Sequence, residues 1–265
     1  MSKSAPDYTF FDLPQVSQFL FHPRPEWGES SSSGFQELMI PVEDETQIGA
    51  RFYETDKTAP NLLFFHGNGE IVADYDDIAG IYRQMNINFF PVDYRGYGKS
   101  NGTPMVSSMM NDSHQIFAFV KTHLENCQCS GPLVVMGRSL GSASALEVAE
   151  HFEQQFDCLI IESGFAFSLP LLRLLGIDVD SVGLDEEQGF VNVAKISRFT
   201  KPSLIIHAEL DHIIPLSDGQ ELFDQCGSKQ KRLLEIKGAN HNNIFAMDLD
   251  NYCRSILDLI DIIMK

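Results

Sequence analysis

Ser139 lies between Gly137 and Gly141 in the stretch GRSLG, which directly follows the apolar run LVVM. This is the G-x-S-x-G pattern of a nucleophile elbow, a tight strand-to-helix turn that holds the serine in a strained backbone conformation. A serine hydroxyl presented in this way attacks the carbonyl carbon of an ester, thioester or amide once a base takes its proton. The sequence therefore predicts that Ser139 is a catalytic nucleophile.

The base that serves a serine nucleophile is usually a histidine, and behind a nucleophile elbow it follows both the serine and the acid in the chain. Four histidines follow Ser139. His151 lies in the segment expected to form the next helix, and His207 lies inside an apolar run. His212 directly follows the best acid candidate, and adjacent residues at a strand end point apart. His241, in the loop GANHNNI after the last apolar run, is the predicted base.

A carboxylate must orient the histidine of such a site. Asp211 ends an apolar run in AELDHIIP and is predicted to orient His241. Glu162, at the end of the preceding apolar run in LIIESGF, is an alternative. It can serve from a neighbouring strand, or it can be a buried support that hydrogen-bonds loop amides.

Acyl transfer also needs hydrogen-bond donors for the oxyanion of the tetrahedral intermediate. One is expected from the backbone N–H of Leu140, the residue after the nucleophile. The other is expected from the loop HGNGE, where Gly67 and Gly69 permit a tight path that aims the backbone N–H of Asn68 inward. His66 is expected to brace this loop and to take no part in the chemistry.

These residues need a sheet that brings them to one edge. Residues 35–42 and 46–54 alternate apolar and polar side chains and predict an antiparallel hairpin. Short apolar runs that stop at Gly, Asp or another polar residue then alternate with segments able to form helices. This pattern predicts an α/β fold with a mostly parallel, doubly wound sheet of about eight strands. Ligands of such sheets bind at the carboxyl ends of the strands, where these polar residues stand.

A run of serines within residues 28–35 is the main compositional break. It predicts an N-terminal arm over residues 1–34 and a single domain over residues 35–265, with a short lid inserted at about 165–200. Apolar lid residues either line an acyl pocket or pack on the sheet. The candidates for the pocket are Phe165, Phe167, Leu171, Leu172 and Leu175.

The formal net charge of −18 argues against nucleic acid and anionic membrane surfaces as partners. Five cysteines show no metal-binding spacing and are expected to be reduced thiols. With neither a signal peptide nor a membrane-spanning run in the sequence, we expect a cytoplasmic location and no membrane anchor. No metal or other cofactor is expected, and the sequence predicts no oligomeric state.

Six segments together resemble the α/β-hydrolase superfamily in their order and spacing: HGNGE, DYRGYGKS, GRSLGSA, LIIESGF, AELDHIIP and GANHN. The resemblance covers about residues 35 to 263 and is greatest to short-lid serine hydrolases of the esterase, thioesterase and lysophospholipase-like branch. It implies the α/β-hydrolase fold. It also implies that Ser139, Asp211 and His241 take the catalytic triad positions, that Asn68 and Leu140 take the oxyanion positions, and that no cofactor is needed.

The expected function is hydrolysis of a carboxylic ester or thioester, of a small or acyl-chain substrate, through an acyl-enzyme. Two alternatives stay open. One is a serine peptidase or amidase, and the other is a catalytically silent binding protein that keeps the fold.

Overall fold

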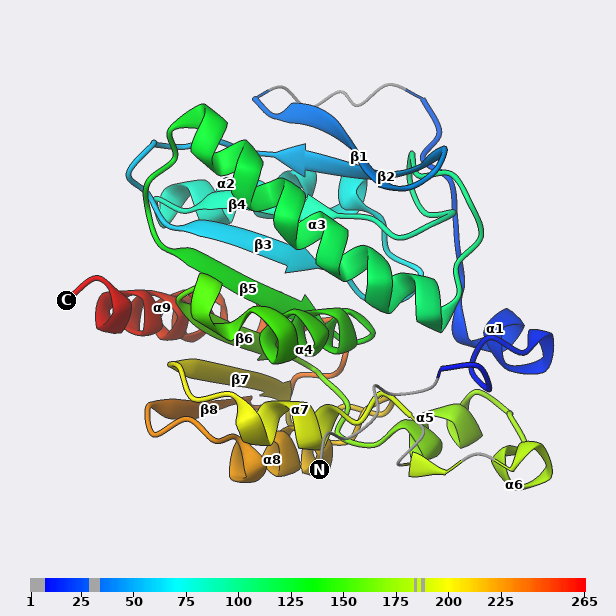
Figure 1. Cartoon of the computed structure of the whole chain (residues 1–265). Coiled ribbons are helices and arrows are strands. Elements are labelled where there is room, and N and C mark those ends of the chain that lie inside the picture. Colours follow the sequence, from blue (N-terminus) through cyan, green and yellow to red (C-terminus); the bar gives the residue numbers. More distant parts are fainter. Residues whose placement is uncertain (1–7, 29–33, 184, 187–188) are drawn as a thin grey trace.

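A computed structural model describes residues 8–28, 34–183, 185–186 and 189–265. An eight-stranded sheet forms its centre, with strand order β1-β2-β4-β3-β5-β6-β7-β8 (Figure 1). Strands β3 to β8 run parallel to one another, whereas β1 and β2 form an antiparallel hairpin and β2 pairs antiparallel with β4. The strands are β1 Gln36–Glu43, β2 Thr46–Phe52, β3 Asn61–Phe65, β4 Asn88–Val92, β5 Leu133–Arg138, β6 Cys158–Glu162, β7 Ser203–Ala208 and β8 Lys231–Ile236.

Helices cover both faces of the sheet (Figure 1). One face packs against α3 Val106–Cys127, α4 Gly141–Phe152, α7 Asn192–Arg198 and α8 Leu216–Gln225, and the other against α2 Asp76–Gln84 and α9 Ile244–Ile263. Helices α5 Ser168–Leu174 and α6 Val179–Val182 follow β6, and α1 Pro14–Leu20 precedes the sheet. Two 3₁₀ turns, η1 Val72–Tyr75 and η2 Glu153–Gln155, complete the described elements.

Burial on both faces explains the continuous apolar runs in the central strands. Successive side chains of β3 enter opposite cores: Leu62 and Phe64 pack with α2 and α9, whereas Leu63 and Phe65 pack with α3 and α4. Because helices cover both sides, an apolar residue is favoured at every position of such a strand.

The predicted fold class is confirmed, including the antiparallel start and the mostly parallel sheet. The expected lid region holds α5, α6 and α7, which lie between β6 and β7. The serine run between arm and domain falls largely outside the described residues. In the part of the chain that the structure describes, no helix is long and apolar enough to cross a bilayer.

Candidate active site

Ser139 follows the last residue of β5 and adopts a left-handed backbone with φ 51°, which is unfavourable for a residue with a side chain. The turn leaves no room at either flanking glycine. A Cβ on Gly137 would overlap the carbonyl oxygen of Gly141, and a Cβ on Gly141 would overlap the carbonyl oxygen of Phe65. The backbone N–H of Ser139 donates to the carbonyl of Glu162 at 2.9 Å. Close packing of β3, β5, β6 and α4 therefore holds the strained turn.

The structure brings Ser139, His241 and Asp211 together from three separate loops. The distance from His241 Nε2 to Ser139 Oγ is 3.0 Å, and that from His241 Nδ1 to Asp211 Oδ2 is 2.7 Å. All three residues are buried, with 8%, 4% and 8% of the surface of Ser139, His241 and Asp211 exposed. A continuous hydrogen-bonded chain of hydroxyl, imidazole and carboxylate results.

The surroundings of Asp211 keep its carboxylate ionised. Burial alone would raise its pKa, but hydrogen bonding to His241, the charge of that ring, and the backbone N–H groups of Ile213 and Ile214 together lower it below the ordinary value. These two N–H groups donate to Asp211 Oδ1 at 3.0 and 2.9 Å. With Asp211 as an acceptor, the Nδ1 atom of His241 carries the proton, and Nε2 is left to accept the proton of Ser139.

Glu162 lies close by but does not contact His241. Its carboxylate pairs with Arg138 Nε at 3.0 Å and accepts a hydrogen bond from the Tyr252 hydroxyl at 2.6 Å. Burial raises the pKa of Glu162 above its ordinary value, and Arg138 and Tyr252 compensate for this only in part. Asp211, and not Glu162, is therefore the acid that the structure brings to the histidine.

Arg138 connects the loops of the site, and sequence reasoning missed it. Its guanidinium also pairs with Glu70 and donates to the carbonyl oxygen of His241 at 2.7 Å. Glu70 Oε2 in turn accepts the backbone N–H of Gly67 at 2.6 Å. Arg138 occupies a position of G-x-S-x-G that accepts any residue, so the motif does not predict its role. The only indication in the sequence was Glu162, because a buried carboxylate needs a cation as its partner.

Within the described residues, the two backbone N–H groups predicted to bind the oxyanion have no partner. Among the described residues, no hydrogen-bond acceptor is found for the N–H of Asn68 or of Leu140. The rest of the Asn68 loop is held in place, since His66 Nδ1 donates to the Gly67 carbonyl at 2.7 Å and the His66 ring is completely buried. His66 thus contacts its own loop, as expected for a residue that braces it.

An apolar cavity of about 270 Å³ lies beside Asp211, between α5 and the segment that precedes α8. Three of the five predicted pocket residues line it: Phe165, Phe167 and Leu171. Leu172 is instead buried in the hydrophobic core and Leu175 packs against that core, so neither lines the cavity. The remaining lining residues are Pro170, Leu174, Asp211, His212, Ile213, Ile214, Pro215 and Asp218.

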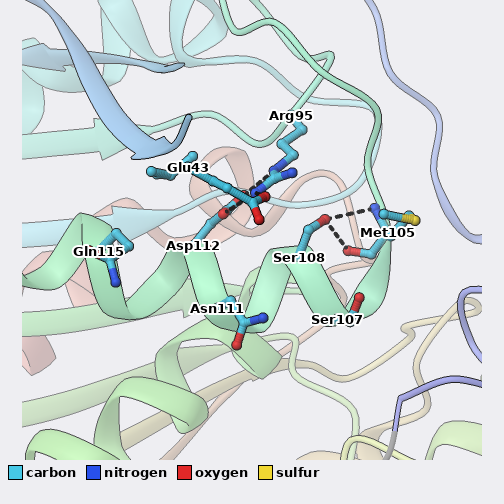
Figure 2. Close-up of a pocket in the computed structure, with 9 residues that line it drawn as sticks. Glu43, Arg95, Met105, Ser107, Ser108, Asn111, Asp112 and Gln115 are labelled. Atoms are coloured by element: carbon cyan, nitrogen blue, oxygen red, sulfur yellow. Dashed lines mark hydrogen bonds and ion pairs between the residues drawn. The ribbon is translucent and has the colours of Figure 1, made fainter. Parts of the chain in front are cut away.

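A second cavity, of about 250 Å³, lies between the α3 surface and the end of β1, and its lining includes neither Ser139 nor His241. Figure 2 shows Arg95 facing the carboxylates of Glu43 and Asp112 there. Both oxygens of Asp112 accept from the guanidinium at 2.8 Å, and Glu43 accepts at 2.9 Å. The one cation lining this cavity is therefore fully paired, and it offers no free charge to a ligand.

The structure offers one group of potential metal ligands within its described residues: His114, Glu147 and His151, on α3 and α4. The Glu147 carboxylate already pairs with the buried ammonium of Lys195 at 2.5 Å and contacts His114 Nε2 at 3.1 Å. These contacts explain why the three side chains lie close together: they belong to an ion-pair network between helices.

Similar folds occur among solved hydrolases. A Pyrococcus furiosus esterase aligns with a TM-score of 0.72 at 14% identity, covering 93% of this chain and 98% of that one. A soluble variant of monoglyceride lipase from Saccharomyces cerevisiae aligns with a TM-score of 0.67 at 16% identity, covering 88% and 97%. At these identities the likeness establishes the fold.

Sequence relatives extend the likeness. A family model described as "Serine aminopeptidase, S33" matches residues 56–174. Human alpha/beta hydrolase domain-containing protein 17B is 28% identical over 254 residues, which cover 90% of this chain and 82% of that protein. The fold and these matches support membership of this chain in the α/β-hydrolase superfamily. Within it, protein bem46 of Schizosaccharomyces pombe is 29% identical over 213 residues, which cover 78% of this chain and 69% of that protein.

Proposed function

We propose that this α/β-hydrolase is a serine hydrolase that cleaves a carboxylic ester or thioester of a small or acyl-chain substrate. One observation supports the proposal most: the hydrogen-bonded chain from Ser139 Oγ through His241 to Asp211, on a strained turn that presents the serine. A structural serine has no need of a buried imidazole and carboxylate aligned behind it, whereas nucleophilic catalysis requires both.

In the first half of the reaction, His241 Nε2 takes the proton of Ser139 while Oγ attacks the carbonyl carbon. The ionised carboxylate of Asp211 stabilises the resulting imidazolium and holds its tautomer. The backbone N–H groups of Asn68 and Leu140 donate to the oxyanion as negative charge develops. His241 then protonates the departing alcohol or thiol, and the acyl group remains on Ser139.

In the second half, a water molecule takes the place of the leaving group. His241 removes its proton, the hydroxide attacks the acyl carbonyl, and collapse of the second tetrahedral intermediate frees the acid and restores the Ser139 hydroxyl. Every step uses side chains and backbone groups of this chain, so the proposed route needs no metal or organic cofactor.

The cavity beside Asp211 supports an acyl substrate, since its lining is mostly apolar and includes Phe165, Phe167 and Leu171. Two of the structural neighbours are an esterase and a monoglyceride lipase, which agrees with ester cleavage. We place the protein in the cytoplasm as part of the proposal, because all five cysteines are free and a reducing compartment preserves thiols.

Hydrolysis of p-nitrophenyl esters from acetate to laurate, together with an acyl thioester, tests the proposal. The wild type is expected to show a rate that peaks at one chain length and that falls to the background in Ser139→Ala. Equal background rates in both proteins on every ester and thioester, with both proteins folded by circular dichroism, would contradict the proposed function.

A peptidase is the second candidate, favoured by the description of the matching family model. The same acyl-enzyme chemistry cleaves amides. Aminoacyl p-nitroanilides assayed beside the esters distinguish the two, because a higher kcat/KM on the anilides, lost in Ser139→Ala, identifies a peptidase. A catalytically silent binding protein would cleave neither substrate class.

A further inference from the structure

The side chain of Asn68 is fixed by the N-terminal part of the chain. Its Nδ2 donates to the carbonyl of Leu20 at 2.7 Å and to His22 Nδ1 at 2.9 Å. Its Oδ1 accepts from the His22 backbone N–H at 2.9 Å and from the Tyr97 hydroxyl at 2.6 Å. An amide has two donor hydrogens and two acceptor lone pairs, so every hydrogen-bonding position of this side chain is filled.

Neighbouring bonds tie the same stretch of residues 20–26, here called the arm segment, to the body of the protein. Arg24 Nε donates to the carbonyl of Gly69 at 2.8 Å. The N–H of Gly98 donates to the carbonyl of Arg24 at 2.9 Å, and the N–H of Glu26 to the carbonyl of Gly98 at 3.0 Å. Four buried side chains anchor this part of the chain. Two precede the arm segment, Phe11 and Val16, and two begin it, Leu20 and Phe21.

Three backbone polar groups that precede Asn68 in its loop have partners within the fold. The Tyr94 hydroxyl donates to the His66 carbonyl at 2.6 Å, Glu70 accepts the N–H of Gly67 at 2.6 Å, and His66 donates to the Gly67 carbonyl. Among the described residues, no hydrogen-bond acceptor is found for the N–H of Asn68. Hydrogen bonds on both sides of Asn68 thus hold the loop, and its backbone N–H has no partner within the fold.

We infer that the arm segment and Tyr97 are positioning elements for the oxyanion donor: they hold the Asn68 side chain so that its backbone N–H is directed at the acyl oxygen. This inference rests on the proposed function. A preorganised donor pays no reorganisation cost when charge develops in the transition state, whereas a mobile loop does. Loss of the side-chain bonds therefore slows acyl transfer more than it weakens substrate binding.

Asn68→Ala removes all four bonds. Tyr97→Phe keeps the ring and removes one of the four, together with the bond that the Tyr97 hydroxyl accepts from the His22 N–H at 2.8 Å. With the p-nitrophenyl ester that the wild type cleaves best, we expect kcat to fall about 10- to 100-fold in Asn68→Ala, somewhat less than on outright loss of an oxyanion donor. In Tyr97→Phe, kcat is expected to fall about 3- to 10-fold, since the Asn68 side chain loses only one of its four hydrogen bonds. KM should stay within about twofold of the wild type, since ground-state contacts are unchanged.

Asn101→Ala is the matched control. The side chain of Asn101 also bridges loops, accepting the N–H of Gln47 at 2.7 Å and donating to the carbonyl of Glu45 at 2.9 Å, but among the described residues it makes no hydrogen bond with Asn68. It is expected to lower the melting temperature and leave kcat unchanged. An equal loss of kcat in Asn101→Ala and Asn68→Ala would contradict the inference, because it would mean that general loosening explains both.

A double-mutant cycle tests whether Tyr97 acts through Asn68. If it does, Tyr97→Phe has little further effect on kcat in the Asn68→Ala background. Fully additive effects, or a wild-type kcat in both single variants, would overturn the inference. Absence of any Ser139-dependent hydrolysis in the wild type is a different outcome, which overturns the proposed function and this inference with it.

Discussion

Asp211 and Glu162 are buried carboxylates with different partners, and the difference separates their roles. Asp211 is bonded to His241, whereas Glu162 is bonded to Arg138 and Tyr252. Removing the charge of Asp211 therefore affects His241 directly. Removing the charge of Glu162 affects the residues that surround the histidine.

Asp211→Asn is expected to lower kcat by about 10⁴-fold, because an amide no longer fixes the productive tautomer of His241. Glu162→Gln is expected to keep kcat within about tenfold while costing about 1–3 kcal/mol of unfolding free energy, since Arg138 loses part of its charge pairing. Kinetics and urea unfolding of both variants check this. The assignment of the two acids fails if Glu162→Gln has the larger effect on kcat.

Sequence reasoning brought Ser139, Asp211 and His241 forward because each stands where an apolar run ends, and the ends of parallel strands share one edge. Arg138 could not be found in the same way. Its partners Glu70 and the His241 carbonyl come from two loops, and Glu162 comes from the end of β6; no local pattern records a contact between such distant parts of the chain.

The turn between β5 and α4 depends on the start of α4 lying close to the end of β3 at Gly141. The Phe65 carbonyl, at the end of β3, occupies the space that a Cβ would need. The same residue type has no such role in α2, where a Cβ on Gly80 would meet nothing within 4 Å.

Gly141→Ala is therefore expected to destabilise the protein by a few kcal/mol and to abolish hydrolysis, because the strand, the turn and the helix must move apart. Gly80→Ala, the matched control in an open helical position, is expected to stabilise it by about 0.5–1 kcal/mol. Chemical unfolding measures both. A folded, fully active Gly141→Ala would show that the turn tolerates displacement.

The segment between β6 and β7 shows where the sequence pattern is insufficient. In α5, Leu169, Leu171, Leu172 and Leu174 lie around most of a seven-residue helix, so apolar periodicity does not define which face is buried. The structure separates them, with Leu172 in the core and Leu171 on the cavity.

Leu171→Trp is expected to fill part of the cavity of about 270 Å³ and to move the preferred ester towards shorter acyl chains. The p-nitrophenyl ester series measures the shift, with Leu257→Trp on the half-exposed outer face of α9 as the control. An unchanged chain-length profile in Leu171→Trp would mean that the acyl group binds elsewhere.

At the scale of the whole molecule, an ion-pair network links parts of the chain that are distant in sequence. Glu147 on α4 pairs with Lys195 on α7, binds His114 on α3, and accepts from the Tyr8 hydroxyl at 3.4 Å. Burial alone would raise the pKa of Glu147, but the hydrogen bond from His114 and the charge of Lys195 lower it to about 2. The formal charge of −18, read from the sequence, gave no indication of this buried pairing.

A carboxyl group with a pKa lowered by folding contributes stability that is present above its unfolded pKa and is lost as pH falls through the folded value. For Glu147 that window runs from about 4.5 down to about 2. Glu147→Gln is expected to cost about 3–5 kcal/mol near neutral pH, because it leaves Lys195 buried without its partner. The difference from the wild type should shrink across the window, as followed by urea unfolding.

Glu150→Gln is the control for this comparison, since Glu150 on the same helix pairs with the half-exposed Arg198 and is expected to cost less than about 1 kcal/mol. If the difference in unfolding free energy between Glu147→Gln and the wild type does not change with pH, the stabilising role of the ionised Glu147 is contradicted.

The most direct test of the central claim is the intact mass of the protein after treatment with a fluorophosphonate, which reacts with activated serine nucleophiles. The wild type is expected to gain the mass of one phosphonyl group, mapped to the peptide that contains Ser139. Ser139→Ala should gain nothing, and His241→Gln should react far more slowly although the serine remains. A wild type that is folded yet unlabelled, or labelling that persists unchanged in Ser139→Ala, would show that Ser139 is not the nucleophile.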